Sequence, residues 1–340
     1  MIETTQPAPS AENRPLLRVE GLRKHFPVSA SWFRRSRSFV HAVDGVSFDL
    51  AQGESFGLVG ESGCGKTTTG KLLIRLTDPT DGHIIFDDGT GAPTDIATLK
   101  GKSLKAFRRK AQMIFQDPYE SMNPRRTIFD TVAEPLQVQK IGSPLERLDR
   151  VTRMLELVGL TPPRTFLFRY PHELSGGQRQ RVAIARALVV EPTFVVADEP
   201  TSMLDVSIRT GVMSLMEELA DRLGISYLYI THDLAVARYM CSRIAVMYLG
   251  KIVEVGETEA LLRHPQHPYT QALLSAVPVP DPMVTRPPVR ITGGVSLPVD
   301  PPARCRFYDR CPLADEFCRT HDQPPLEDKG SGQLVACYKV

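Results

Sequence analysis

The chain has 340 residues, of which 42% are hydrophobic and 24% are charged, and its formal net charge is +2. This length exceeds one typical domain, so we expect two, and the composition is that of a soluble globular protein. The net charge is too small to argue for nucleic acid or an acidic molecule as the partner. No run of 18 apolar residues occurs, which excludes a membrane-spanning helix from the predicted elements.

The first 50 residues predict half-buried strands on either side of an insertion. Residues 17–20 and 46–50 alternate apolar and polar side chains, as antiparallel strands with one solvated face do. Residues 31–37 between them are basic and aromatic, and they fit a solvated loop or a contact with a membrane or a partner. The first 15 residues lack the apolar stretch of a signal peptide, so we expect no export.

Residues 60–67 match the phosphate-binding pattern G-x-x-x-x-G-K-[ST] at every required position. An apolar run at 55–59 precedes them and a helical pattern at 68–76 follows, which is the context that the pattern requires. Glycines let backbone N–H groups turn inward around phosphate oxygens, and the start of a helix adds a positive dipole end. We therefore predict a nucleotide-binding loop made of Gly60, Glu61, Ser62, Gly63, Cys64, Gly65, Lys66, Thr67 and Thr68. Lys66 would reach the outer phosphates, and the Thr67 hydroxyl would bind Mg²⁺.

The middle of the chain predicts a helical lobe inserted into an α/β core. The predicted elements, in order, are a strand at 82–88, a helix at 103–110, a strand at 111–115, helices at 128–139, 144–158 and 177–189, a strand at 194–197, a helix at 208–223, and strands at 225–230, 244–248 and 251–254. Because residues 194–197 are wholly apolar, we expect a strand that is buried on both faces of a parallel sheet. Successive helices between strands predict a lobe at about 125–190 on the edge of the core.

Polar residues follow three of these strands, at Gln116, at Asp198 and Glu199, and at His232. Ligands of open α/β sheets bind at the carboxyl ends of the strands, so these residues are candidates for the chemistry. Asp198 would hold Mg²⁺ through water, and Glu199 would polarise a water molecule for attack on the γ-phosphate. Gln116 could bind Mg²⁺ or orient water, and His232 could hydrogen-bond the γ-phosphate. Taken singly, a Gln or a His in such a place more often has a structural role.

A second phosphate-binding element is predicted where small residues open a helix, in the sequence Leu174-Ser175-Gly176-Gly177-Gln178. The first N–H groups of a helix have no partner within it, so they are suited to an anion. The separation of Ser175, Gly176, Gly177 and Gln178 from Gly60 in the sequence indicates that they serve a nucleotide bound by another molecule.

The composition changes past residue 264. Ten prolines fall between Pro265 and Pro302, which predicts a linker or an extended arm. Four of the six cysteines follow, separated by five, six and 18 residues: Cys305, Cys311, Cys318 and Cys337. In a chain without an export signal, we expect metal ligands or reduced thiols rather than disulfides. We place one domain at 16–262 and a C-terminal module at 263–340.

Together, these motifs resemble the ATP-binding subunits of ABC transporters over about residues 16–262. The phosphate loop, Gln116, the Leu174–Gln178 segment, the Asp198-Glu199 pair and His232 occur in the order that this family has. The resemblance implies an α/β fold, an ABC-type ATPase core in which a P-loop parallel sheet is joined by an antiparallel β region and an inserted helical lobe. It also implies that two subunits pair head to tail, so that Ser175 and Gly177 contact the γ-phosphate of ATP held by the partner.

The same resemblance implies roles for single residues. Glu199 would be the general base, and His232 would hold γ-phosphate, water and base in register. Asp205 would bridge the dimer interface, and Phe26 would stack on adenine. Met203 departs from the family, which usually has a small residue at this position.

A closer resemblance extends to the ATPases of oligopeptide and dipeptide importers, whose architecture nickel and glutathione importers share. It rests on residues 113–119, 121–125, 247–250 and 267–274 and on the cysteine-bearing tail. It implies an ATP-hydrolysing subunit that uses Mg²⁺ on the cytoplasmic face of the bacterial inner membrane, as a peripheral protein. The implied partners are two membrane-spanning permease subunits, a second ATPase subunit (a homologue or a second copy) and an extracytoplasmic solute-binding protein.

Two other classes of protein are weighed against this interpretation. A soluble ABC-type ATPase acting on nucleic acid or ribosomes would carry a coiled coil, zinc modules or two cassettes, whereas this chain has one phosphate loop and no heptads. A non-hydrolysing regulatory cassette is opposed by the presence of Glu199 and His232.

For the four cysteines, three hypotheses stay open. Structural zinc sites usually contain pairs of cysteines two to four residues apart, and the spacing here is wider. Wider loops suit an iron–sulfur cluster, and some of the importer ATPases that the tail resembles are thought to carry a [4Fe–4S] centre. Zinc and unliganded thiols are the alternatives. The role of a cluster here would be structural, because no electron-transfer chemistry is apparent elsewhere in the chain.

Overall fold

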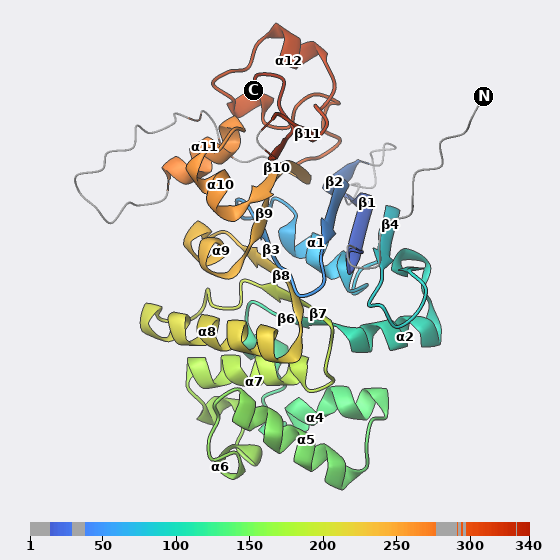
Figure 1. The fold of residues 1–340 in the computed structure, drawn as a ribbon, viewed down its shortest axis with the longest axis vertical. Helices are drawn as coiled ribbons and strands as arrows, with labels where there is room; N and C mark the ends of the chain where they lie inside the picture. The colour runs from blue at the N-terminus through green and yellow to red at the C-terminus, as the bar shows by residue number, and fades with distance from the viewer. Residues whose placement is uncertain (1–13, 29–37, 277–290, 292–293, 295–296, 331) are drawn as a thin grey trace.

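The computed structural model describes residues 14–28, 38–276, 291, 294, 297–330 and 332–340. Two sheets lie between a helical lobe at one end of the molecule and the C-terminal segment at the other (Figure 1). The basic insertion expected at 31–37 lies outside the described residues. Among the helices that are described, none combines the length and the apolar character needed to cross a membrane.

The larger sheet positions the nucleotide loop. It has eight strands in the order β11-β12-β10-β9-β3-β8-β7-β6. Their bounds are β3 Ser55–Val59, β6 Ala111–Ile114, β7 Phe194–Asp198, β8 Ser226–Thr231, β9 Arg243–Tyr248, β10 Lys251–Glu257, β11 Glu327–Asp328 and β12 Leu334–Val335. The strands from β9 to β6 are parallel, and β10, β12 and β11 extend the sheet with antiparallel pairs. Strand β3 is therefore an interior strand of this sheet. The loop that follows it lies at the same edge as the carboxyl ends of β8, β7 and β6.

The smaller sheet is antiparallel, in the order β2-β1-β4-β5. Its strands are β1 Leu17–Pro27, β2 Phe39–Leu50, β4 Asp81–Phe86 and β5 Thr94–Asp95. The first two are longer than the alternation of the sequence predicts, because their pairing continues from Leu17 opposite Leu50 to Pro27 opposite Phe39, next to the insertion. This pairing sets Val40 and Ala42 beside the nucleotide loop.

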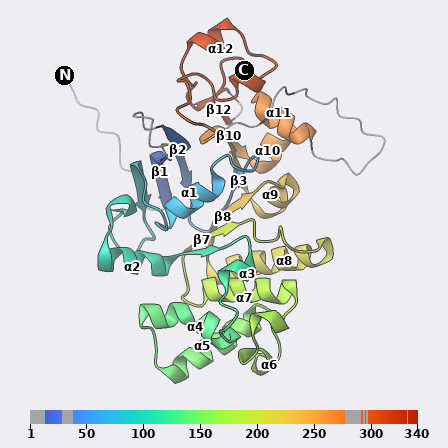
Figure 2. The same ribbon diagram turned by 180° about the vertical axis from the view of Figure 1, so that it is seen from behind.

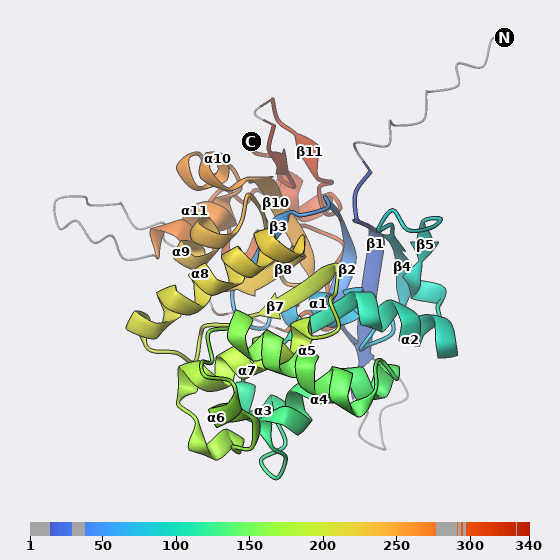
Figure 3. The same ribbon diagram turned by 60° about the horizontal axis from the view of Figure 1, so that its bottom comes forward.

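Helices surround these sheets, as seen from behind in Figure 2 and from below in Figure 3. Their bounds are α1 Lys66–Leu73, α2 Gly101–Lys110, α3 Pro118–Ser121, α4 Ile128–Gln139, α5 Pro144–Leu157, α6 Arg164–Leu167, α7 Gly176–Leu188, α8 Val206–Leu223, α9 Leu234–Met240, α10 Thr258–Arg263, α11 Pro268–Ser275 and α12 Glu316–Thr320, with short 3₁₀ turns at Ile96–Thr98, Pro171–Glu173 and Tyr308–Arg310. Helices α4 to α7 form the lobe, α8 and α9 lie on one side of the core, and α2 lies with the small sheet on the other. The predicted α/β core, with its antiparallel β region and inserted helical lobe, is confirmed, and α4, α5 and α7 match their predicted bounds within one residue.

The prediction of a linker or extended arm between Pro265 and Pro302 is wrong for its first part, where helix α11 forms. Pro268 stands at the first turn of α11, where its missing N–H costs nothing, and the His267 side chain accepts a hydrogen bond from the Tyr269 N–H at the start of this helix. Tyr269 is fully buried, so this helix is part of the core. Prolines therefore mark a helix start here rather than an extended arm.

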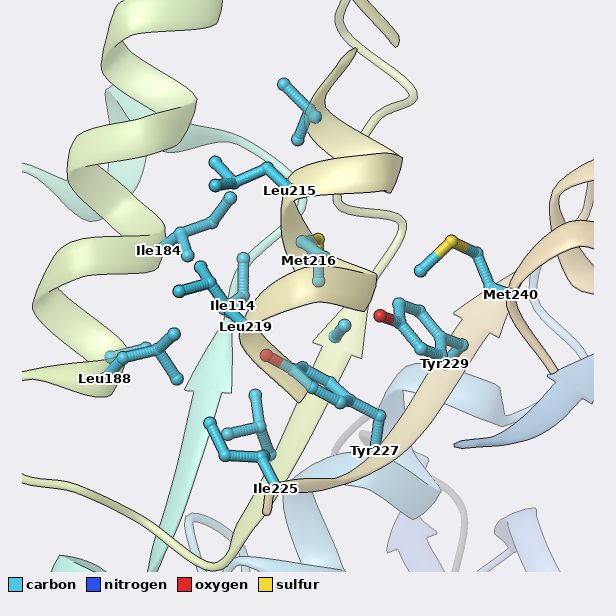
Figure 4. Close-up of a cluster of buried hydrophobic side chains, with 14 of the residues drawn as sticks. Ile114, Ile184, Leu188, Leu215, Met216, Leu219, Ile225, Tyr227, Tyr229 and Met240 are labelled. Atoms are coloured by element: carbon cyan, nitrogen blue, oxygen red, sulfur yellow. The ribbon is translucent and has the colours of Figure 1, made fainter. Parts of the chain in front are cut away.

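Strands β7 and β8 are buried on both faces, as predicted for residues 194–197. On β8, Tyr227 and Tyr229 face the cluster shared with α7 and α8, whereas Leu228 and Ile230 face the cluster shared with α1 and the small sheet. Figure 4 shows the first cluster, with both tyrosine rings among Ile, Leu and Met side chains. The rings are stacked at 5.1 Å, and neither hydroxyl has a hydrogen-bond partner among the described residues.

We expect Tyr227→Phe to leave the stability of the protein unchanged or to raise it by up to about 1 kcal/mol, because a buried hydroxyl without a partner is unfavourable. The measurement is the midpoint of urea unfolding. Tyr227→Leu is the control, since loss of ring packing should lower the midpoint. A lower midpoint for Tyr227→Phe would mean that the hydroxyl contributes a hydrogen bond.

Candidate functional site

A cavity of about 590 Å³ opens at the carboxyl end of β3. Its lining brings together Val40, Ala42, Gly60, Glu61, Ser62, Gly63, Gly65, Lys66, Thr67, Thr68, Gln116, Glu199, His232, Leu273, Leu297 and Pro298. Most of the predicted phosphate-loop residues and all three residues predicted for water and γ-phosphate contacts therefore face one space. Its mixture of backbone N–H groups, one ammonium and fixed polar side chains is suited to a polyphosphate.

Two glycines allow the loop to pass between neighbouring backbones. Gly65 has a φ of 111°, and a Cβ atom there would stand 2.1 Å from the carbonyl oxygen of Ala42 on β2. Gly60 has a φ of 154°, and a Cβ atom there would stand 2.2 Å from the carbonyl oxygen of Met247 on β9. Both backbone conformation and space thus require glycine.

Lys66 and Thr67 begin α1 directly beneath the cavity. The Lys66 ammonium donates hydrogen bonds to the carbonyl oxygens of Gly60, at 2.7 Å, and Glu61, at 2.9 Å. The Thr67 hydroxyl donates to Asp198 Oδ1 at 3.1 Å. Burial raises the pKa of Asp198, and the bond from Thr67 opposes that effect. The Thr67 hydroxyl and the Asp198 carboxylate together offer oxygen ligands, which a hard cation such as Mg²⁺ prefers.

Glu199 is held by groups from both neighbouring strand ends. Gln116, after β6, donates from Nε2 to Glu199 Oε2 at 3.1 Å, and His232, after β8, lies with Nδ1 2.8 Å from Glu199 Oε1. A carboxylate oxygen accepts, so Nδ1 of His232 is the donor of this bond, and in a neutral imidazole Nε2 is then an acceptor. Glu199 has a φ of 45°, and its N–H donates to the Ile230 carbonyl oxygen at 2.8 Å. This left-handed backbone conformation is uncommon for residues other than glycine, and such residues cluster at functional sites.

Cys64 is the one predicted loop residue whose side chain turns away. It is 2% exposed and packs in the cluster under the small sheet, with its sulfur 3.8 Å from the Lys66 ammonium. Burial raises the pKa of the Cys64 thiol. Only its backbone can take part in binding phosphate.

The other predicted contacts lie outside the cavity of this chain. Ser175 caps α7 in a reciprocal pair, in which its hydroxyl accepts from the Gln178 N–H and the Gln178 side chain accepts from the Ser175 N–H. Asp205 is exposed at the start of α8 and makes no side-chain cap there. Phe26 is 40% exposed and is not among the lining residues, although its pairing partner Val40 is.

Sequence reasoning missed the part of the cavity wall that comes from distant segments. Leu273 belongs to α11, and Leu297 and Pro298 come from the described residues farther along. Val40 and Ala42 were missed because strand β2 is longer than its predicted part. Apolar residues of this kind carry no motif, so no local signal could have identified them.

The four cysteines of the tail also come together. Cys305, Cys311, Cys318 and Cys337 line one small cavity, with aromatic and apolar neighbours. Burial raises the pKa of Cys305 to about 11 and also raises the pKa values of Cys311 and Cys337. Such thiols stay protonated unless a cation among them favours the thiolate.

A second group of ligand-type side chains consists of His25, His41 and Asp44, with one ligand atom of each within 4.8 Å of the others. Asp44, however, already faces Lys251 at 3.3 Å and Arg23 at 3.7 Å, and it also pairs with Arg306. A metal ion bound here would be repelled by these three positively charged side chains, so we assign no metal to this group.

Comparisons with known proteins identify the families that the chain resembles. The family model described as "ABC transporter" matches residues 43–202, and the one described as "Oligopeptide/dipeptide transporter, C-terminal region" matches residues 253–318. A dipeptide transport ATP-binding protein of Haemophilus influenzae is 46% identical over 97% of this chain and 98% of its own. An oligopeptide transport ATP-binding protein of Bacillus subtilis is 44% identical over the same shares. A putative peptide import ATP-binding protein of Brucella ovis is 48% identical over 96% of this chain and 98% of its own.

Solved structures are similar over the ATPase part. A dimeric ATP-binding cassette bound to ADP and Pi has a TM-score of 0.61 and 29% identity, and it covers 71% of this chain and 98% of its own. A component of an ABC transporter complex from Clostridium perfringens has a TM-score of 0.61 and 27% identity, and it covers 74% of this chain and 92% of its own.

We expect Gly65→Ala to weaken nucleotide binding by more than about tenfold, because the new Cβ would displace the loop from Ala42. The measurement is the dissociation constant of Mg²⁺-ATP. Gly53→Ala is the matched control, since Gly53 also has a positive φ, of 74°, but nothing lies within 4 Å of its Cβ position. Equal affinities for the two variants would show that the close approach to Ala42 has no effect on binding.

Proposed function

This chain belongs to the ABC transporter family of ATP-binding proteins, and from that membership we propose that it is the ATP-hydrolysing subunit of a membrane importer for di- and oligopeptides. ATP and Mg²⁺ are the cofactors of this family of ATPases. The observation that supports a peptide substrate is the extent of the sequence similarity to peptide transport proteins. Relatives named for peptide, dipeptide or oligopeptide transport align along nearly the whole chain, including its C-terminal region.

For the reaction, we assign each residue of the cavity a role. The N–H groups of the phosphate loop and Lys66 would hold the β- and γ-phosphates, and Thr67 and Asp198 would hold Mg²⁺. Glu199 would accept a proton from the attacking water, and Gln116 and His232 would fix its carboxylate by the two hydrogen bonds described above. With attack in line with the leaving oxygen, positioning and charge stabilisation supply most of the rate.

The remaining predicted residues support pairing with a second cassette. Ser175, Gly176, Gly177 and Gln178 lie outside this chain's cavity. The Gln178 N–H is capped by the Ser175 hydroxyl, whereas the N–H groups of Gly176 and Gly177, at the start of α7, have no carbonyl partner within the helix. We propose that this segment binds the ATP held by the partner, with Ser175 and Gly177 in contact with its γ-phosphate. Asp205 would lie in the interface, and Phe26 would stack on adenine. The partner cassette would be a homologous subunit, with a second copy of this chain as the alternative.

The assembly would contain two permease subunits and receive solute from an extracytoplasmic binding protein. ATPase subunits of such transporters are membrane-associated, so we place this chain on the cytoplasmic face of the bacterial inner membrane, as a peripheral protein. Residues 16–262 would form the ATPase domain and residues 263–340 the C-terminal module, with β12 of the module paired to β10 of the domain.

We further propose that the four cysteines hold an iron–sulfur cluster. All four residues line one cavity, and thiolates are the ligands that such clusters use. The gaps of five, six and 18 residues between the cysteines are wider than those of usual structural zinc sites, which favours a cluster over a single zinc ion. The cluster would tie the tail together rather than transfer electrons.

Glu199→Gln should lower ATP turnover by about 10²- to 10⁴-fold, as expected for loss of a general base, while ATP binding is retained. Both quantities are measured in the assembled transporter, together with uptake of a labelled dipeptide, which should stop. Glu218→Gln, on the exposed surface of α8, is the control and should behave as the parent protein does. Substantial remaining turnover would remove Glu199 from this role, and continued ATPase activity without peptide uptake in the parent protein would remove the peptide assignment.

Anaerobic purification should yield a brown protein with about four irons and four acid-labile sulfides per chain. Cys318→Ala should lose the colour, whereas Cys241→Ala, which changes a buried cysteine of the core, should keep it. A colourless protein with one zinc and no sulfide would assign the site to zinc. A protein free of both metals would leave the cysteines as thiols.

A further inference from the structure

The phosphate loop is held from outside its own strand and helix by the C-terminal segment. The N–H of Glu61, the second residue of the loop, donates a hydrogen bond to the Tyr269 hydroxyl at 3.0 Å. Tyr269 comes from α11 and is fully buried, so its hydroxyl is fixed in place. Leu273, one turn farther along α11, lines the nucleotide cavity itself.

The side chain of Glu61 is held by the same segment. The two terminal nitrogens of Arg310 donate to the two Glu61 carboxylate oxygens at 2.9 and 3.2 Å. Arg310 is 11% exposed and Glu61 is 25% exposed, so water screens this pair only partly. Bidentate pairing of an arginine with a carboxylate adds geometric constraint to charge, so the position of the loop depends on the position of Arg310.

The loop between Cys305 and Cys311 carries this arginine and a second one. Arg306 pairs with Asp44 on β2, two residues beyond Ala42 in the cavity wall. Between the two arginines, Phe307 is buried against Tyr248 and Tyr269, with ring centroids 5.2 and 5.5 Å apart. The segment between the two cysteines is therefore packed on the nucleotide site at two charged contacts and one aromatic contact.

We infer that Arg310 and Tyr269 are positioning residues of the nucleotide site, which act through Glu61 to hold the phosphate loop in the conformation that binds ATP. This inference rests on the proposed ATPase function and goes beyond it by making the Cys305–Cys311 loop a determinant of ATP affinity. Neither residue lines the cavity, so neither contacts the nucleotide directly.

The test is the dissociation constant of a non-hydrolysable ATP analogue with Mg²⁺, measured on the full-length chain. Arg310→Met should weaken binding about tenfold, because the Glu61 carboxylate loses two charge-assisted hydrogen bonds. Arg310→Lys should recover part of the affinity, since it keeps the charge but not the bidentate geometry. Tyr269→Phe should weaken binding about threefold through loss of a single hydrogen bond to the loop.

A merely structural role is distinguished by a matched control and by the state of the tail. Arg238 makes a similar bidentate pair with Glu259, at 2.6 and 3.0 Å, on α9 and α10, so Arg238→Met should leave the affinity unchanged. Thermal unfolding and iron content are measured for every variant. The inference requires weaker binding by Arg310→Met at an unchanged unfolding temperature and iron content.

Three outcomes would overturn the inference. These are equal affinity in Arg310→Met and the parent protein, an equal loss in Arg238→Met, and a loss that occurs only together with unfolding or loss of iron. Tyr269→Phe gives an independent answer if Arg310→Met does not fold, because it retains the ring and its packing. If the parent protein itself fails to bind the analogue, the proposed function fails, whereas normal binding by the parent and by both variants contradicts only the positioning role.

Discussion

The nucleotide site depends on the close approach of three backbones. The phosphate loop passes between β2 and β9, and the carbonyl oxygens of Ala42 and Met247 stand where side chains of Gly65 and Gly60 would be. Interiors of proteins are packed too tightly to absorb such an overlap. The N–H groups of the loop can therefore converge on a phosphate only if the two sheets keep their relative position. The antiparallel sheet is in this sense part of the binding site.

The pattern of residues predicted much of this arrangement. The run from Ser55 to Thr67 is local, and strand, loop and helix each follow from residue type, so the loop could be placed before its surroundings were known. Gln116, Glu199 and His232 could also be selected, because parallel strands bring their carboxyl ends to one edge. The hydrogen bonds from Gln116 and His232 to Glu199, which connect the three residues, could not be predicted from the sequence, because they depend on the three-dimensional structure.

What could not be predicted is long-range. Tyr269 and Arg310 lie 208 and 249 residues from Glu61 in the sequence. Tyr269 belongs to the segment 267–274 on which the resemblance to peptide importers rests, but nothing in that segment indicates a contact with Glu61, and Arg310 belongs to none of the motifs. Proline content also misled, since Pro268 opens a helix in which Tyr269, Thr270 and Ala272 are buried. The cysteines were noticed by their type, but their convergence on one cavity depends on how the tail folds back on the core. The part of the site that was missed is thus the part built from contacts between distant segments.

The burial of Cys64 has a consequence for chemical labelling. A thiolate is the form that reacts with alkylating agents and oxidants, and a buried thiol with a raised pKa presents little of it. The cysteine in the middle of the phosphate loop is therefore protected from reagents that inactivate proteins through exposed thiols. The pKa values of Cys305, Cys311 and Cys337 are raised too, but these cysteines are less deeply buried, so a thiol reagent that meets the folded chain without a bound cluster reaches the tail before the loop. Inactivation by such a reagent would thus report damage to the tail and not to the nucleotide-binding motif.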